Sequence, residues 1–193
     1  MPFELPESAG DGETTLERTA DLNAFLREVE MKAYRIAVIN VRDRDEALDI
    51  VQDAMLRLAT RYAGRPSEEW RPLFYRILTN RVRDWHRRRA VSGRILSFFG
   101  GQDGELPDPI VAARGPSDRE PHEEAAAEDT MRALEQALAA LPERQRQAFM
   151  LRNFEDLDVA QTAVAMGCSD GSVKTHYSRA VRRLRELLGE LES

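Results

Sequence analysis

Hydrophobic side chains recur at intervals of three and four residues in several separate stretches of the chain. From about residue 21 to residue 41 this spacing predicts an amphipathic helix, with Asp21 placed to cap its first turn. The positions expected to face the core are Leu22, Leu26, Val29, Ala33, Ile36 and Ala37. A second helix is predicted from about Asp45 to Tyr62. Its apolar stripe, which we interpret as core, consists of Leu48, Val51, Met55, Leu58 and Tyr62.

The Gly-Arg-Pro-Ser sequence at residues 64–67 predicts a turn before a third helix. That helix is expected to start at Glu68 or Glu69 and to run to about Arg89, with Pro72 tolerated in its first turn. From about residue 91 to residue 121 the periodicity gives way to Gly, Pro, Asp and Ser, which is the composition of an interdomain linker. The apolar run at residues 95–99 is the exception. We interpret it as packing on the end of the third helix, with docking of a partner as the alternative.

Helical patterns return in the last third of the chain. Glu123 to Leu141 is predicted to form one helix, and Pro142 is expected to open the next, with Phe149 and Leu151 pointing inward. A short helix from Asp158 to Met166, a left-handed turn at Gly167 and a final helix to about Leu188 then make a helix-turn-helix arrangement.

The pattern contains no strand-like alternation, so the sequence predicts an all-α fold. We expect two small helical domains joined by a flexible acidic linker, with the helix-turn-helix in the C-terminal domain. The expected boundaries are a disordered acidic N-terminus at 1–20, a first domain at 21–92, a linker at 93–122 and a second domain at 123–190.

Charge is segregated along these 193 residues, which carry a formal net charge of -6. Eight arginines crowd residues 71–94 against the single acid Asp84, and a second basic cluster lies at residues 174–185. The stretch between these clusters is acidic. Two basic surfaces separated by an acidic spacer indicate two contacts on one nucleic acid.

Several function classes are not expected from the composition. No apolar run is long enough to span a membrane, and the acidic N-terminus has no signal-peptide pattern, so we expect a cytoplasmic location. The single cysteine, Cys168, and three dispersed histidines predict no disulfide, metal site or cofactor. We interpret Cys168 as a small packing residue, with a redox sensor as the alternative. Neither a paired acid cluster nor a phosphate-binding glycine loop stands out, so an enzyme is not expected.

The final helix places apolar and polar side chains on opposite sides. Its inward positions are expected to be Val173, Tyr177, Ala180, Val181 and Leu184. Its outward positions are Lys174, Thr175, Ser178, Arg179 and Arg182, which together with Ser172 near the start of the helix make a set that suits the major groove of DNA. The alternative is a solvated basic helix.

The third helix interleaves arginines with aromatic residues, namely Trp70, Phe74, Tyr75 and Trp85. Rings beside cations can stack on unpaired bases while the cations hold the phosphates. The alternative is that the rings are core, and we prefer that interpretation for Phe74. Asn80 and the arginines on its side of the helix are harder to explain by packing.

Three segments together resemble one known family. They are DEALDIVQDAMLRL, PLFYRILTNRVRDWHRRR and LPERQRQAFMLRNFEDLDVAQTAVAMGCSDGSVKTHYSRAVRRLREL. In order and spacing they are similar to the extracytoplasmic-function sigma factors of bacterial RNA polymerase, and the likeness covers most of residues 21–190. It implies a two-domain transcription initiation factor, with sigma region 2 at 21–92 and sigma region 4 at 123–190. A stand-alone helix-turn-helix regulator is the alternative, although it would have no use for the DIVQD face or the aromatic third helix.

The resemblance also implies partners and site residues. Core RNA polymerase would be bound through its beta-prime clamp helices and its beta flap, the former by Asp49, Gln52 and Asp53. The minus-ten element would be melted and held by Asn80, with Arg76, Arg83, Arg87 and Arg88 on the DNA backbone. The minus-thirty-five element would be read by the outward set of the final helix, with Arg152 reaching a phosphate. Family members are commonly silenced by an anti-sigma factor, often held at the inner membrane. Leu73 replaces a tryptophan that is frequent in the family, and the neighbouring Pro72 is unusual.

Overall fold

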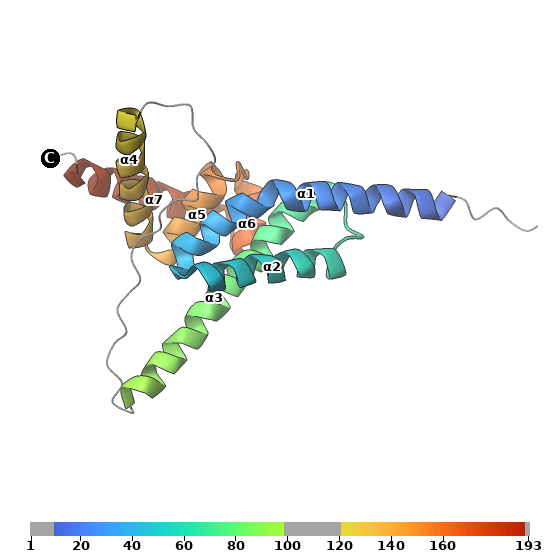
Figure 1. Ribbon diagram of the computed structural model, residues 1–193, viewed down its shortest axis with the longest axis horizontal. Helices are drawn as coiled ribbons and strands as arrows, with labels where there is room; N and C mark the ends of the chain where they lie inside the picture. The colour runs from blue at the N-terminus through green and yellow to red at the C-terminus, as the bar shows by residue number, and fades with distance from the viewer. Residues whose placement is uncertain (1–9, 99–120, 192–193) are drawn as a thin grey trace, which may run out of the picture.

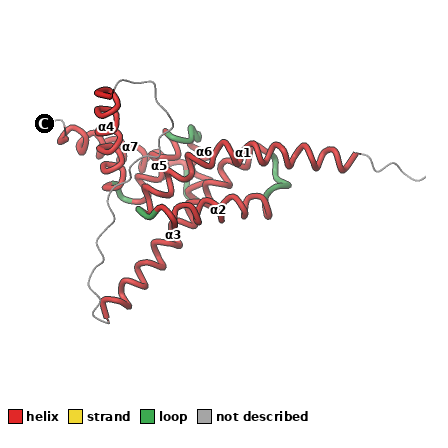
Figure 2. The backbone as a smooth tube through the Cα atoms, viewed as in Figure 1, coloured by secondary structure: helices red, strands yellow, loops and turns green. Residues whose placement is uncertain are grey.

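The computed structural model describes residues 10–98 and 121–191, and all regular secondary structure in these ranges is α-helical (Figures 1 and 2). The helices of the N-terminal half are α1 (Gly10–Val41), α2 (Arg44–Arg61) and α3 (Ser67–Phe98). Those of the C-terminal half are α4 (Pro121–Ala140), α5 (Glu143–Asn153), α6 (Val159–Met166) and α7 (Asp170–Leu191). The predicted all-α fold is therefore confirmed. None of the described helices combines the length and the apolar character needed to cross a membrane.

Polar side chains and left-handed residues fix the ends of the helices. The Asp43 carboxylate accepts hydrogen bonds of 3.1 Å from the backbone N–H groups of Asp45 and Glu46, which caps α2. A capping box starts α6, because Asp158 and Gln161 each accept from the other's backbone N–H, at 2.7 and 3.0 Å. Gly167 has a φ of 63° and ends α6, as the sequence predicts.

Two helices are longer than the sequence pattern predicts. The first begins at Gly10, so residues 10–20 are helical rather than part of a disordered N-terminus, and Asp21 lies inside the helix rather than at its cap. Residues 13–20 contain no Gly or Pro, and extending an existing helix costs little once it is nucleated. The third helix continues to Phe98 and has Pro72 in its second turn, not its first. Its backbone therefore includes residues 95–98 of the apolar run, and Phe99 lies outside the described residues.

The core of the N-terminal half differs from the expected stripe at one position. On α2 the buried side chains are Ala47, Ile50, Val51, Ala54 and Leu58. Leu48 is 44% exposed, so its assignment to the core is wrong. The buried face is centred on two alanines that hydrophobic periodicity does not emphasise, and this rotates the apolar stripe away from Leu48. On α1 the expected positions from Leu22 to Ala37 are buried or half-buried.

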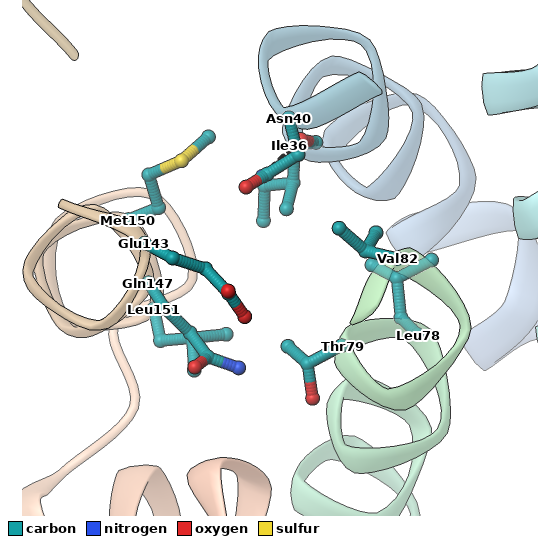
Figure 3. Close-up of a pocket in the computed structure, with 9 residues that line it drawn as sticks. All are labelled: Ile36, Asn40, Leu78, Thr79, Val82, Glu143, Gln147, Met150 and Leu151. Carbon is teal, nitrogen blue, oxygen red and sulfur yellow. Dashed lines mark hydrogen bonds between the residues drawn. The ribbon is translucent and has the colours of Figure 1, made fainter. Parts of the chain in front are cut away.

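The two halves pack against each other and share one continuous hydrophobic core. Helix α3 lies against α6, and the end of α1 reaches α4 (Figure 1). A cavity of about 20 Å³ lies at this junction. Figure 3 shows its lining, with residues of α1 and α3 on one side and residues of α5 on the other. The lining consists of Ile36, Asn40, Leu78, Thr79, Val82, Glu143, Gln147, Met150 and Leu151. We call the conformation in which the N-terminal and C-terminal halves pack against each other the closed conformation.

Candidate nucleic-acid interface

Helix α7 presents a continuous polar surface to solvent. Lys174, Thr175, Ser178, Arg179 and Arg182 are all exposed, and Val173, Ala180 and Leu184 on the opposite side are buried. The predicted division of α7 into an inner and an outer face is therefore confirmed. Three cationic side chains and two hydroxyls on one face can reach the base edges and phosphates of a DNA groove.

Contacts with α5 hold α7 in place. The rings of Phe149 and Tyr177 stack with an interplanar angle of 14° and centroids 6.2 Å apart. The Tyr177 hydroxyl also donates a hydrogen bond of 3.3 Å to the Asn153 side-chain oxygen. Because Val173 and Leu184 are buried, α7 is fixed along its length and its outer face has a defined direction.

The turn between α6 and α7 determines where α7, the helix predicted to read DNA, begins. Ser169 caps α7, since its hydroxyl oxygen accepts a hydrogen bond of 3.3 Å from the backbone N–H of Ser172. The two serine hydroxyl oxygens lie 2.9 Å apart, so half-buried Ser172 takes part in the cap rather than pointing freely outward. Cys168 is half-buried in this turn, and burial raises the pKa of its thiol, which favours packing over redox chemistry.

Arg152 is engaged inside the C-terminal half. Its guanidinium donates a hydrogen bond to the backbone carbonyl of Leu157, which ties the end of α5 to the connector before α6. The side chain is half-buried. The predicted phosphate contact would have to use the other N–H groups of the Arg152 guanidinium. It remains a prediction.

The predicted minus-ten residues lie along the exposed side of α3. Asn80, Arg76 and Arg88 are exposed. Arg87 is also exposed and pairs with Asp84 at 3.1 Å. Arg83 is half-buried, and its guanidinium lies 3.8 Å from the Glu143 carboxylate of the C-terminal half. In the closed conformation one of the predicted DNA contacts is therefore occupied by an acid of this chain.

The aromatic side chains of α3 are not available for base stacking. Trp70, Phe74, Tyr75 and Trp85 are all buried, with at most 7% of their surface exposed. Phe74 packs edge-to-face on Tyr75, with centroids 5.1 Å apart. The idea that these rings hold unpaired bases is therefore wrong for the closed conformation, because α1, α2 and the C-terminal half bury them.

The predicted polymerase-binding face lies on α2. Asp49 and Gln52 are exposed and turned away from the core. Asp53 is half-buried and pairs with Arg57 at 3.6 Å and with Arg81 of α3. Asp49 and Gln52 are thus open to a partner, whereas Asp53 already neutralises cations of its own chain.

A buried polar cluster that sequence reasoning missed joins the two halves. Glu155, in the α5–α6 connector, is buried, and its carboxylate lies 3.6 Å from the Arg71 guanidinium of α3. Burial raises the pKa of the Glu155 carboxyl, against the lowering influence of the Tyr75 hydroxyl, Lys32 and Arg71. Burial and Glu155 together raise the pKa of Tyr75. Neither the carboxylate oxygens nor the Tyr75 hydroxyl has a hydrogen bond within 3.5 Å among the described residues. A lone Glu in a connector gives no sequence signal of such burial.

Within the described residues, no group of three or more His, Cys, Asp and Glu side chains is placed to hold a metal ion. The surfaces described above are suited to binding macromolecules through charge and hydrogen bonding.

Comparison with known proteins places these surfaces in one family. Residues 131–184 match the family model described as Sigma-70, region 4, which covers α5, α6 and most of α7. The RNA polymerase sigma-E factor of Streptomyces avermitilis is 30% identical over 174 residues, covering 90% of this chain and 86% of that protein. The ECF RNA polymerase sigma factor SigM of Mycobacterium tuberculosis is 30% identical over 171 residues, covering 88% and 78%.

A solved structure agrees with these relatives. The sigma factor RpoE of Bartonella quintana, in complex with the anti-sigma factor NepR, matches with a TM-score of 0.60 and 27% identity, covering 86% of this chain and 97% of that one. The relatives align across both halves, which a stand-alone helix-turn-helix regulator would not explain, so that alternative is wrong. The chain belongs to the extracytoplasmic-function sigma factors of bacterial RNA polymerase and acts in transcription initiation.

Proposed function

We propose that this sigma factor brings core RNA polymerase to promoters by reading the minus-thirty-five element with α7 and the minus-ten element with α3. The observation that carries the proposal is the outer face of α7. Its five exposed polar side chains are held in a fixed direction by a buried inner face, and none of the five is covered by the N-terminal half. Members of this family are initiation factors rather than enzymes.

The polymerase contact is assigned to the exposed face of α2 around Asp49 and Gln52. Carboxylate and amide side chains on a helix suit a basic, hydrogen-bonding partner such as the clamp helices of the beta-prime subunit. A second contact, between the C-terminal half and the beta flap, would position α7 on upstream DNA.

Promoter binding by this scheme requires the closed conformation to open. The Thr79 hydroxyl lies 3.2 Å from the backbone carbonyl oxygen of Ala165, and Lys174 follows Ala165 by nine residues. Since a chain spans at most about 3.6 Å per residue, the Cα atoms of Asn80 and Lys174 lie within roughly 45 Å of each other. Elements centred about 25 base pairs apart are separated by roughly 85 Å at 3.4 Å per base pair. Helix α3 must therefore part from α6 before both elements can be held.

An anti-sigma partner is also proposed. The solved RpoE structure with NepR shows that a protein of this fold can be bound by an anti-sigma factor. A partner that holds the two halves together or covers α2 would oppose the steps described above.

The deciding experiment is in vitro transcription with purified core polymerase and a library of promoter fragments, followed by mapping of start sites. We expect initiation downstream of a shared pair of elements, only when this protein is added. A second arm compares the wild-type chain with a Lys174→Ala/Arg179→Ala variant, which should lose initiation while still co-eluting with core polymerase. Initiation that is unchanged in this variant, or that has no preference for sequence, would remove α7 from promoter reading.

A further inference from the structure

A cavity of about 260 Å³ opens on the surface where the two halves meet, beside the junction seen in Figure 3. The end of α1 contributes Asn40, Val41 and Arg42, α3 contributes Trp85, His86 and Arg89, and α5 contributes Arg146. Because Arg146 belongs to the C-terminal half and the other lining residues to the N-terminal half, the cavity is complete only in the closed conformation.

The lining carries three guanidinium groups and no carboxylate. Within the described part of the chain, no ion pair within 4.0 Å involves Arg42, Arg89 or Arg146. Glu143 is the acid that acts on Arg146, and its carboxylate also lies 3.8 Å from the Arg83 guanidinium. Asp43 and Glu46 line a neighbouring cavity, which shares Trp85 and Arg89 with this one. The lining itself therefore has a net positive charge, and its acidic neighbours Glu143, Asp43 and Glu46 lie outside the lining.

Arg146 is the buried member of this set, with only 8% of its surface exposed. Its Nε donates to the Asn40 side-chain oxygen at 3.0 Å and its NH1 to the Ala139 carbonyl at 3.1 Å. The Asn40 and Ala139 oxygens are neutral acceptors. They hold the guanidinium in position but do not balance its charge. Burial lowers the pKa of Arg146, the Glu143 carboxylate opposes this, and Arg42 adds a smaller lowering. Burying a cation is costly, Glu143 offsets only part of that cost for Arg146, and an anion in the cavity would offset more of it.

Arg89 and His86 form other parts of the cavity lining. The Arg89 guanidinium sits over the Trp85 ring, 5.1 Å from its centroid, which holds it at the rim. The His86 Nε2 is buried and has no hydrogen-bond partner among the described residues. Burial lowers the pKa of His86, so the neutral ring adds no charge to the lining.

We propose that this cavity, formed by Arg42, Arg89 and Arg146 from both halves of the chain, binds a compact phosphate-bearing anion. Guanidinium groups match phosphate oxygens in pairs, and three cations need an anion of charge two or more. The volume accommodates inorganic phosphate, pyrophosphate or the terminal phosphates of a small metabolite. Because the site is built from both halves, the anion stabilises the closed conformation by mass action. The consequence for transcription rests on the function proposed above, whereas the binding itself does not.

Isothermal titration calorimetry of the full-length chain with sodium pyrophosphate tests the binding. We expect saturable binding that weakens by about tenfold or more in Arg89→Gln and in Arg42→Asn, because each change removes charge-assisted hydrogen bonds. Asn is chosen at position 42 because the residue there has a φ of 55°, which Asn tolerates. Arg65→Gln, at the opposite end of α2, removes the same charge far from the cavity and should leave the affinity unchanged.

Two calorimetric results would overturn the proposal. One is the absence of saturable binding for both pyrophosphate and inorganic phosphate. The other is an equal loss of affinity in Arg65→Gln, which would mean that pyrophosphate binds through overall charge. If a short DNA duplex binds through Arg89 and Arg42 while pyrophosphate does not, the cavity is part of the DNA surface and the proposal is wrong.

The proposed link between anion binding and the closed conformation can be tested separately. Pyrophosphate should weaken co-elution of the wild-type protein with core polymerase and should have a smaller effect on Arg89→Gln. An equal effect on both proteins would refute the coupling, because pyrophosphate would then act on the polymerase. If the wild-type chain does not bind core polymerase at all, the proposed function fails, and the calorimetric result still decides the anion site.

Discussion

The hydroxyl group of Thr79 in α3 lies 3.2 Å from the backbone carbonyl oxygen of Ala165 in α6, 86 positions away, and 3.1 Å from that of Arg76 in its own helix, so the two carbonyls share its one hydrogen. Thr79 precedes Asn80, the residue predicted to engage the minus-ten element, and Ala165 lies in the first helix of the helix-turn-helix. The two parts of the chain that are predicted to bind promoter DNA are therefore in contact where the proposed promoter binding requires them to separate.

Replacing Thr79 with Val removes this hydrogen bond while nearly preserving side-chain volume. We expect Thr79→Val to weaken the closed conformation by about 1 kcal/mol, since a buried carbonyl loses its donor. Small-angle scattering should show a larger radius of gyration, and affinity for core polymerase should rise. Thr60→Val is the matched control, because the Thr60 hydroxyl donates within its own helix to Leu56 on the exposed side of α2. Weaker polymerase binding by Thr79→Val would contradict a restraining role for the contact.

The Glu155 carboxyl makes stability depend on pH in a defined direction. Burial raises its pKa in the folded protein above the ordinary value of 4.5, so the folded state holds this proton to higher pH than the unfolded state. The stabilising contribution is thus fully present below pH 4.5 and is lost as the pH rises through the raised pKa. Glu155→Gln should flatten this part of the profile, because the amide carries no charge at any pH.

Urea unfolding of both proteins across this pH range provides the measurement. Asp156→Asn is the control, because Asp156 is exposed and its φ of 51° is tolerated by Asn. If Glu155→Gln and the wild-type protein lose stability in parallel as the pH rises, the buried carboxyl is not the group responsible.

Local chemistry explains why much of the C-terminal half could be predicted from the sequence. The left-handed backbone at the end of α6 favours Gly at position 167. The helical spacing of apolar residues such as Val173 and Leu184 determines which side of α7 is buried. In both cases neighbouring residues carry the information, and the structure agrees with the expectation.

The features that escaped prediction depend on contacts between distant segments. The sequence pattern of α3 suggests that Trp85 and Tyr75 stack on bases, but both side chains are buried in the core by other helices that pack around α3. Arg146 and Asn40 form a hydrogen bond across 106 positions, and neither residue stands out in its own helix. Periodicity describes one helix at a time, so it carries no information about a junction made by two halves of the chain.

Gly167 offers a test of how the turn positions α7. A Cβ added there meets no atom within 4 Å, so the cost of Gly167→Ala comes from its φ of 63° rather than from a clash. We expect a loss of about 1 kcal/mol in the free energy of unfolding. Gly64→Ala is the control, because a Cβ there also meets nothing and its φ is not in the left-handed region. Equal effects of the two substitutions in urea unfolding would mean that the left-handed geometry costs nothing.

The outer face of α7 is expected to contribute to DNA binding without contributing to stability. Arg179 is exposed, and no ion pair within 4.0 Å involves it in the described part of the chain. Arg179→Ala should weaken promoter binding by the holoenzyme by about 1–3 kcal/mol if it reads a base. Its melting temperature should match that of the wild-type protein. Arg65→Ala, in the N-terminal half, should leave promoter binding unchanged, and fluorescence anisotropy with a labelled promoter measures both.

Asp49 provides the cleanest test of the polymerase-binding face, for a reason that only the structure supplies. The resemblance to the family points equally to Asp49, Gln52 and Asp53, but Asp53 pairs with Arg57 and Arg81, so changing it also disturbs the packing of α2 on α3. Asp49 is exposed, and no ion pair within 4.0 Å involves it among the described residues. Asp49→Lys should therefore reverse a surface charge without altering the fold, and should weaken binding to core polymerase by roughly tenfold or more. Glu30→Lys makes the same change on the exposed side of α1 and should bind normally. Size-exclusion chromatography with core polymerase compares the two, and co-elution of Asp49→Lys at wild-type levels would move the polymerase contact away from this face of α2.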